Sequence, residues 1–150
     1  YFNDRELKLY KMFEYVKGAK VAGKATPKSI VFITAHFITN FDREFDWNAA
    51  AIADENGNFS AVLPYATSED NFFVKPLSPY VIYSDGKIVE LNVTNNDVYQ
   101  GKNINIDVKK GEKAPKDFET SVKDLLKSIV GQGKTLGHLN IHKKVIKEEK

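Results

Sequence analysis

The stretch ADENGNFSAVLPY, residues 53–65, joins a polar turn to an alternating strand, and it decides which fold the sequence predicts. Gly57 can take the positive φ that a tight turn needs, and the side chains of Asp54 and Asn58 can hydrogen-bond to their own backbone. Apolar and polar residues then alternate through FSAVL, which is the two-residue period of a half-buried strand. The stretch therefore predicts a hairpin turn at residues 54–58 that leads into a strand.

The oxygen-bearing side chains of this turn also resemble the beginning of a calcium-binding loop. Asp54, Asn56 and Asn58 alternate as the first ligands of an EF-hand do. The glycine, however, stands at the fourth position of that loop instead of the sixth, and no Glu closes the loop at the twelfth position. No helical pattern flanks it either. These departures favour a structural turn over a metal site.

Apolar and alternating segments continue on both sides of the turn. The runs at residues 30–38 and 44–53 are joined by Asn-Phe-Asp-Arg, which predicts a long hairpin. Asp85-Gly86 between two more apolar runs is a strong hairpin signal. TNNDVYQG has the cap and stop residues of one helical turn. Further strands are predicted at 6–15, 19–25 and 103–108, with a short one beginning near residue 71.

The pattern changes from Gly111 onward. Pro115 stands where a helix can begin, glycines follow as a stop signal, and apolar residues between them recur at helical spacing: Phe118, Val122, Leu125 and Ile129. These residues predict one amphipathic helix at 115–130, followed by a last strand with a charged tail.

The predicted fold class is mainly β with one helix (α+β), an antiparallel β-sandwich or a barrel-like domain. Residues 1–110 would form the β-rich part, and residues 111–150 would add the helix and the final strand to the same domain. A chain of 150 residues that is 42% hydrophobic can bury one sizeable core, which agrees with a single domain. Because the chain begins at Tyr1 without a Met, we expect either a piece of a longer protein or a processed chain.

Composition excludes several kinds of function. The formal net charge is only +2, and nearly all basic residues are Lys, which lacks the planar fork of Arg, so a nucleic-acid partner is not expected. The absence of Cys excludes disulfides, thiolate nucleophiles and Cys-based zinc sites. No apolar run approaches the roughly 20 residues that span a bilayer.

The histidines offer one possible metal geometry. His138 and His142 stand four residues apart and would share one face of a helix or strand. No Glu lies beside them in a zincin arrangement, and a third ligand would have to come from elsewhere. Both are therefore expected to be solvated side chains, and the remaining histidine, His36, falls inside a predicted strand.

Carboxylates give no catalytic constellation in the sequence. Asp42, Glu44 and Asp46 gather near a predicted turn, where like charges need only face water. Asp124 and Lys127 lie one turn apart on the predicted helix and suggest a weak surface ion pair. No nucleophile elbow or phosphate-binding glycine loop is present. We therefore expect no catalytic, cofactor-binding or metal-ligating residue in this chain.

Two further patterns have both a functional and a structural interpretation. Asn58 and Asn92 begin N-x-[ST] sequons, a number close to the chance expectation, and the sequence does not decide whether either carries a glycan. Eight aromatic residues would mostly fill a β core but could form a sugar-stacking platform: Phe41, Phe45, Trp47, Tyr65, Phe72, Phe73, Tyr80 and Tyr83.

Several motifs occur in an order that resembles one protein family. The successive segments are LKLYKMFEYVKGAKVAGKATP, NFDREFDWNAAAIADENGNFSAVLPYAT and VKPLSPYVIYSDGKIVELNVTNNDVYQGK. Together they are similar to the region that follows the catalytic core in archaeal oligosaccharyltransferase catalytic subunits. The resemblance spans residues 7–101 and rests on several motifs rather than one.

The resemblance implies a β-rich peripheral domain on the extracytoplasmic face of the membrane. Its parent enzyme transfers a lipid-linked oligosaccharide to Asn in sequons with a divalent metal, Mn or Mg, which makes N-glycosylation the implied process. The implied partners are the remainder of the membrane enzyme and, nearby, the lipid-linked oligosaccharide or the acceptor protein. The WWDYG motif and the membrane helices are absent from this chain. The family also has an acceptor-side motif, D-x-x-K followed by Met or Ile. This chain meets it only in part, because Asp124 and Lys127 are present but Gly131 stands where the final apolar residue belongs. The resemblance thus implies a non-catalytic domain of a glycosyltransferase.

Two other classes stay open. VAGKATP followed by AIADENGNFSAVLP is also similar to bacterial Ig-like repeats, which would make the chain a free-standing sandwich module of a surface or adhesion protein. Such modules have about 80 to 100 residues and end without a helix, so the predicted helix favours the enzyme domain. A small hydrolase would require an acid pair that meets only in the fold.

Overall fold

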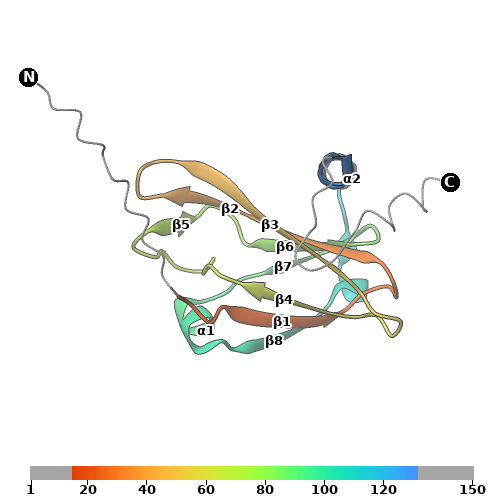
Figure 1. The fold of residues 1–150 in the computed structure, drawn as a ribbon, viewed down its shortest axis with the longest axis horizontal. Coiled ribbons are helices and arrows are strands. Elements are labelled where there is room, and N and C mark those ends of the chain that lie inside the picture. Colours follow the sequence, from red (N-terminus) through yellow and green to blue (C-terminus); the bar gives the residue numbers. More distant parts are fainter. Residues whose placement is uncertain (1–14, 132–150) are drawn as a thin grey trace, which may run out of the picture.

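The computed structural model describes residues 15–131, which form two β-sheets packed face to face (Figure 1). Apart from Tyr15, the strand predicted at 6–15 lies outside the described residues. The final strand and tail predicted at 134–150, with His138 and His142, also lie outside them. These parts stay predictions.

The smaller sheet has three strands in the order β4-β1-β8. β1 (Ala19–Lys24) runs antiparallel to β4 (Asn58–Leu63) and parallel to β8 (Asn103–Asp107). The predicted antiparallel β-sandwich is confirmed, with the β1–β8 pair as a parallel exception among the described strands. The chain reaches β8 through α1 (Asn95–Gln100), and a connection that contains a helix lets a strand return in the same direction as its neighbour.

The larger sheet has six strands. Its order is β3 (Glu44–Ile52), β2 (Ile30–Thr39), β6 (Tyr80–Ser84), β7 (Lys87–Leu91) and β9 (Glu112–Lys113), while β5 (Val74–Pro76) pairs with one end of β2. Both hairpins predicted in this sheet are confirmed. In the tighter one, Asp85 and Gly86 have φ of 49° and 76°, the left-handed geometry of a type I′ turn.

The core lies between the two sheets. On β2, alternate side chains such as Ile33 and Phe37 are fully buried and face the smaller sheet. Leu63 from β4 and Val21 from β1 are fully buried on the other side. Since the strands form two separate sheets, the fold is a sandwich and not a closed barrel.

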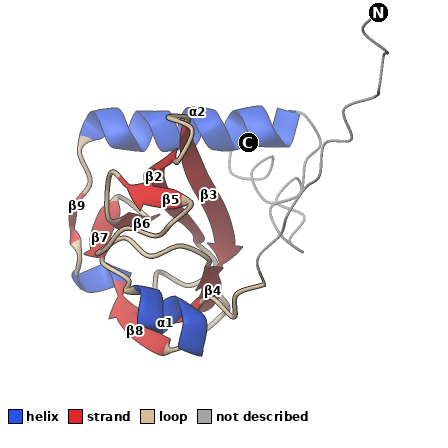
Figure 2. Cartoon of the chain, turned by 90° about the vertical axis from the view of Figure 1, so that its left-hand side faces the viewer, coloured by secondary structure: helices blue, strands red, loops and turns tan. Residues whose placement is uncertain are grey.

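A third layer covers the outer face of the larger sheet. The helix α2 (Lys116–Gly131) confirms the helix predicted at 115–130 and lies across that sheet in Figure 2. Its Val122 is buried against Phe32 and Tyr83, which point away from the core between the sheets. Phe118, Leu125 and Leu126 complete the contact, whereas the side chain of Ile129 is not among those described.

The helical turn predicted near residue 95 is present as α1, so the described chain has two α-helices instead of one. Thr94 caps α1: its hydroxyl accepts from the Asp97 amide, and the Asp97 carboxylate accepts from the Thr94 amide at 3.0 Å. A short 3₁₀ turn, η1 (Val108–Lys110), follows β8. Because β9 pairs with β7 and α2 packs on the larger sheet, the described residues beyond 110 contact the sandwich. The division of the chain at residue 110 stays a prediction.

The turn predicted at 54–58 joins strands of different sheets and is not a β-hairpin turn. β3 belongs to the larger sheet and β4 to the smaller one. The connection between β1 and β2 crosses between the sheets at the same place, and backbone hydrogen bonds link the two crossings. Ala25 N donates to Gly57 O at 2.8 Å, and Ala53 N donates to Ser29 O at 2.9 Å. The turn residues were identified correctly, but the partner of β4 was not.

We expect Leu125→Ala to lower the free energy of unfolding by about 2 kcal/mol, the low end for a Leu truncation, because this side chain is only partly buried under α2. The control is Thr120→Ala on the exposed side of the same helix, which should change stability by less than about 0.5 kcal/mol. Urea unfolding followed by circular dichroism measures both. Equal stability of the two variants would show that α2 is not docked.

Candidate functional site

A polar cluster on the larger sheet is built by strand register. The β2–β3 hairpin places His36 opposite Asp46, with Glu44 two residues away on the same face. The Nδ1 atom of His36 lies 2.6 Å from Asp46 Oδ1, and its Nε2 atom lies 3.0 Å from Glu44 Oε2. Asp42, the third carboxylate of the predicted group, has a φ of 56° within the turn and takes no part in this contact.

This arrangement favours the protonated imidazole. Hydrogen bonds to Asp46 and then to Glu44 raise the pKa of His36 above its ordinary value. A neutral imidazole has one N–H, so only one of its two carboxylate contacts can then be a hydrogen bond. The cluster joins the edge strand β3 to β2. Sequence reasoning missed it, although the turn at 40–43 already fixes the register that brings residues 36 and 46 together.

In the polar turn at 54–57, the Asp54 carboxylate accepts hydrogen bonds from neighbouring residues. Asp54 Oδ1 accepts from the amides of Asn56 and Asn58 at 2.8 Å each, and Oδ2 accepts from the Asn58 side chain at 3.0 Å. These hydrogen bonds, that of the Asn58 side chain first, lower the pKa of Asp54. Gly57 has a φ of 78° and lies against the carbonyl of Ala25. All of these contacts hold the crossing between the sheets.

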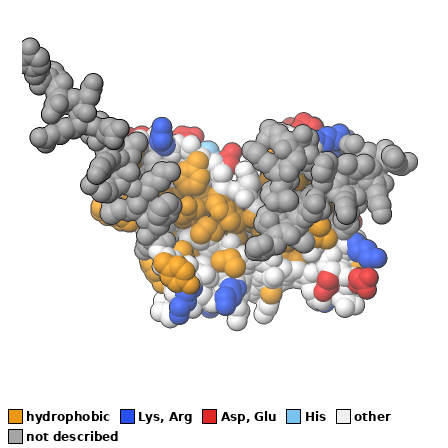
Figure 3. Space-filling model, in the orientation of Figure 1, with side chains coloured by type: hydrophobic (Ala, Val, Ile, Leu, Met, Phe, Trp, Pro, Cys, Tyr) orange, Lys and Arg blue, Asp and Glu red, His pale blue; other side chains and the backbone are white. Residues whose placement is uncertain are grey.

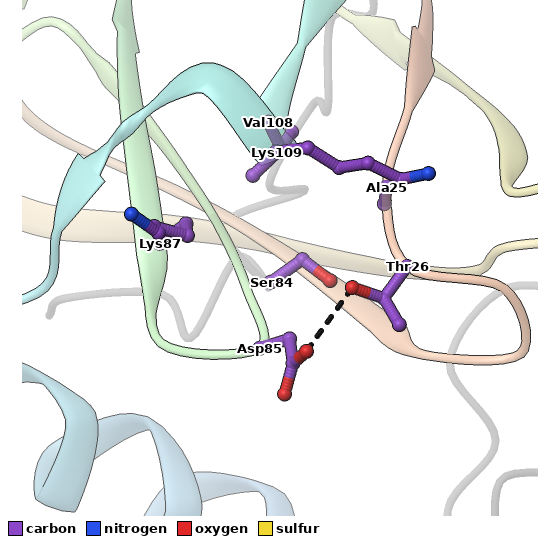
Figure 4. A pocket seen from close by; sticks show the side chains of 7 residues that line it. All are labelled: Ala25, Thr26, Ser84, Asp85, Lys87, Val108 and Lys109. Carbon is purple, nitrogen blue, oxygen red and sulfur yellow. Dashed lines mark hydrogen bonds between the residues drawn. The ribbon is translucent and has the colours of Figure 1, made fainter.

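A small hollow lies beside this crossing, with a volume of about 160 Å³ (Figure 4). Thr26 and Ser84 contribute hydroxyls to it, and Lys87 and Lys109 lie at its sides. Both hydroxyls already have partners: Thr26 Oγ1 donates to Asp85 Oδ2 at 3.1 Å, and Ser84 Oγ donates to Ile30 O at 3.1 Å. Ligand sites usually have about 300 to 1,000 Å³, so this hollow is too small for a sugar chain.

The remaining predicted side chains are spread over the surface. Asn58, Asn92, Asp124 and Lys127 are exposed and come from three different parts of the fold, the last two from α2. Among residues 15–131, no three His, Asp or Glu side chains come together as metal ligands. No helix in that range is long and apolar enough to cross a membrane.

The eight aromatic residues divide into two groups. Phe45, Trp47, Tyr65 and Tyr80 pack with Phe37 in the core, and Tyr83 packs against Phe118 of α2. The hydroxyl of Tyr80 donates to Tyr65 O at 2.9 Å, and burial raises its pKa. Phe41 and Phe72 are instead about four-fifths exposed, at 82% and 80%, and Phe73 is 46% exposed. The exposed group is separate from the packed one.

Comparison with known proteins identifies the class to which this sandwich belongs. Residues 18–104 match a family described as the archaeal glycosylation protein B long peripheral domain. This stretch contains both sheets except β9 and most of β8, so the matched class is that of the sandwich itself. The chain belongs to this family.

Relatives of known function are much longer than this chain. It is 35% identical over 100 residues to dolichyl-phosphooligosaccharide-protein glycotransferase 3 of Archaeoglobus fulgidus, an alignment that covers 65% of this chain and 11% of that protein. It also resembles the oligosaccharyltransferase AglB of the same organism, solved with an inhibitory peptide and a dolichol-phosphate, with a TM-score of 0.57 and 33% identity over 62% of this chain and 11% of that one. A structure of an oligosaccharyltransferase of that organism with Zn and sulfate gives a TM-score of 0.56 at 33% identity, over 61% of this chain and 12% of that one. The chain spans about a tenth of these relatives.

The turn at 54–57 can be tested with a matched pair of glycines. Gly57 and Gly86 have φ of 78° and 76°, so alanine at either position should cost about 1 to 2 kcal/mol of backbone strain. A Cβ at Gly57 would also meet the Ala25 carbonyl, while a Cβ at Gly86 would meet nothing within 4 Å. Thermal unfolding should therefore show a larger loss for Gly57→Ala than for Gly86→Ala. Equal losses would mean that the crossing is not closely packed.

The His36 cluster predicts a definite pH dependence. Because its folded pKa lies above 6.5, His36 stabilises the fold below pH 6.5, and this contribution is lost as the pH rises through the folded pKa. The stability of the wild type relative to His36→Gln should thus be greatest near pH 6 and should fall toward pH 8. Unfolding measured at several pH values tests the difference. An NMR titration midpoint of His36 at or below 6.5 would contradict it.

Proposed function

We propose that this chain is a non-catalytic peripheral domain of an oligosaccharyltransferase, which transfers a lipid-linked oligosaccharide to Asn in protein sequons. The observation that carries the proposal is the family match over residues 18–104 together with the long glycotransferase relative. The same match favours this function over a free-standing Ig-like module. The domain acts as a rigid accessory of the longer enzyme.

The polar side chains of the sandwich support a structural role. Asp54 closes the crossing between the sheets, and His36 joins two strands. The pKa of Asp97 is lowered first by the Thr94 amide in the cap of α1, and Lys102 lies 3.2 Å from its carboxylate. Each of these groups is held by neighbours that serve the local fold. None is aimed at a hollow in which a reaction would take place.

The metal of the parent enzyme does not fit the described part of this domain. Its acidic pair Glu44 and Asp46 is already bridged by His36, whose raised pKa favours the protonated form that cannot bind a metal. We therefore assign a divalent metal, Mn or Mg, to the remainder of the enzyme and derive no step through it here.

We place the domain on the extracytoplasmic face of the membrane, beside the membrane-spanning part of its parent. The lipid-linked oligosaccharide and the acceptor protein would be handled by that part. The basis is the resemblance to the long relatives, one of which was solved with a peptide and a dolichol-phosphate. The domain contributes stability to this assembly rather than a reacting group.

The isolated 150-residue chain should transfer no glycan to a sequon peptide, even with lipid-linked donor and manganese supplied. Activating an amide nitrogen requires preorganised carboxylates and a metal, which we assign to the remainder of the enzyme. In the longer polypeptide, deletion of the domain should lower the yield of folded enzyme more than the turnover of the enzyme that does fold.

A matched pair of variants sharpens this test. Leu63→Ala removes a fully buried core side chain and should cost about 2 to 5 kcal/mol, whereas Val62→Ala changes the adjacent side chain, which is 53% exposed. Only the first should reduce the yield of folded enzyme, and neither should change its turnover. Glycan transfer by the isolated chain, or loss of turnover in well-folded Leu63→Ala enzyme, would overturn the non-catalytic assignment.

A further inference from the structure

One end of the sandwich exposes large apolar side chains that nothing in the described fold covers. They are Phe41, Phe72, Phe73 and Leu77, which we call the apolar tip, and they are 82%, 80%, 46% and 50% exposed. Isolated exposed apolar residues are ordinary, but a group of this kind marks an interaction surface.

The four side chains come from adjacent segments. Asn40 N, in the turn that carries Phe41, donates to Phe73 O at 3.0 Å, and Leu77 N donates to His36 O at 2.8 Å. The rings of Phe72 and Phe73 lie 4.9 Å apart. In Figure 1 the β2–β3 turn and β5 lie at the same end of the domain, opposite the crossing at 54–57, and in Figure 3 hydrophobic atoms gather toward that end.

The form of the tip indicates a macromolecular partner. Its aromatic side chains project from turns and loops, and the hollow with polar walls lies at the other end of the sandwich. Projecting aromatic side chains act as anchors when they enter apolar recesses of another protein surface. The apolar tip therefore favours a protein surface over a small ligand.

The charges around the tip distinguish protein from lipid. The flanking acids Asp42, Glu69 and Asp70 outnumber the flanking bases Arg43 and Lys75. Adsorption to an anionic bilayer depends on an excess of basic residues, whereas a rim with both signs is typical of a protein interface. The length of the relatives indicates which protein: about nine-tenths of each lies outside the matched stretch.

We propose that the apolar tip is the surface by which this domain docks onto the remainder of the longer polypeptide that carries it. The partner surface is an apolar recess with a rim of both charges. The inference rests on the proposed function for the existence of that polypeptide. Domain contacts within one chain need little area, because the linkage keeps the partners at high effective concentration.

Thiol labelling of the longer polypeptide tests the proposal, since this domain has no Cys of its own. Lys75→Cys places a thiol at the rim and leaves all four apolar side chains intact. Glu55→Cys is the control at the opposite end, where the side chain is 85% exposed. Any other thiols of the polypeptide are replaced by Ser, and alkylation is measured in detergent micelles and in phospholipid vesicles.

The thiol at Lys75→Cys should react about tenfold or more slowly than the same thiol in the 150-residue chain, as expected if the undocked form is a tenth or less of the population. The thiol at Glu55→Cys should react at similar rates in both. Adding Phe72→Ser should restore fast labelling at position 75 by removing an anchor ring. Faster labelling in this double variant would show that the protection comes from docking and not from the local surroundings of the thiol.

The other outcomes overturn the proposal. Fast labelling at position 75 in the longer polypeptide excludes docking through the tip, and protection found only in vesicles assigns the tip to lipid. Protection that depends on the concentration of the 150-residue chain assigns it to a second copy. Glycan transfer by the same preparation is measured in parallel. Transfer without protection overturns the docking alone, whereas protection without transfer overturns the proposed function and leaves the docking.

Discussion

The strand β2 must be covered on both faces, and the rest of the fold depends on this requirement. Val31, Ile33 and Phe37 are fully buried toward the smaller sheet, while Phe32 is 2% exposed toward the opposite side. One face therefore needs a second sheet and the other needs a helix. Burial of apolar area is the main favourable term in folding, so a central strand of this kind determines the number of layers.

Strand pairing on both edges of β2 adds to the burial of its two faces. β2 pairs with β3 along nearly its whole length, and its other edge is shared by β6 and β5. The two chain crossings between sheets are hydrogen-bonded to each other, so the sheets are held together at that end by backbone as well as by side chains. The Asp54 carboxylate fixes one crossing through hydrogen bonds from Asn56 and Asn58 of its own turn. The domain thus has a closed end with defined polar contacts and an open end with exposed Phe rings.

Local patterns predicted the elements well because the physics of each element is local. The apolar run at residues 30–38, the Asp85-Gly86 turn and the cap at Thr94 each depend on neighbours a few residues away. The partner of β4 could not be predicted in this way. A turn such as Asp54 to Asn58 has the same chemistry whether the next strand stays in its sheet or leaves it. Packing of Phe59 and Leu63 against distant residues makes that choice.

The candidate sites also differ in whether their contacts follow from local sequence or from the pairing of distant residues. The contacts of the Asp54 turn follow from residues four positions apart and were predicted in kind, whereas the pairing of His36 with Asp46 requires the hairpin register. This register could have been predicted from the sequence, because the turn at 40–43 fixes it. Function was predicted from the ordered motifs alone. A domain whose polar groups serve its own fold offers no catalytic pattern from which function could be derived.

At the open end of the sandwich, the fold itself does not account for the exposed aromatic residues. The β2–β3 turn is stabilised by the Thr39 hydroxyl, which accepts from the amides of Phe41 and Arg43, and by the left-handed conformation of Asp42. None of these features requires an aromatic ring at position 41. The hydrogen bond from Phe73 N to the Asn71 side chain likewise involves backbone that any residue but proline supplies. Exposed rings at such positions lower solubility and contribute little to the core of the domain, so the reason for them lies in a contact outside it.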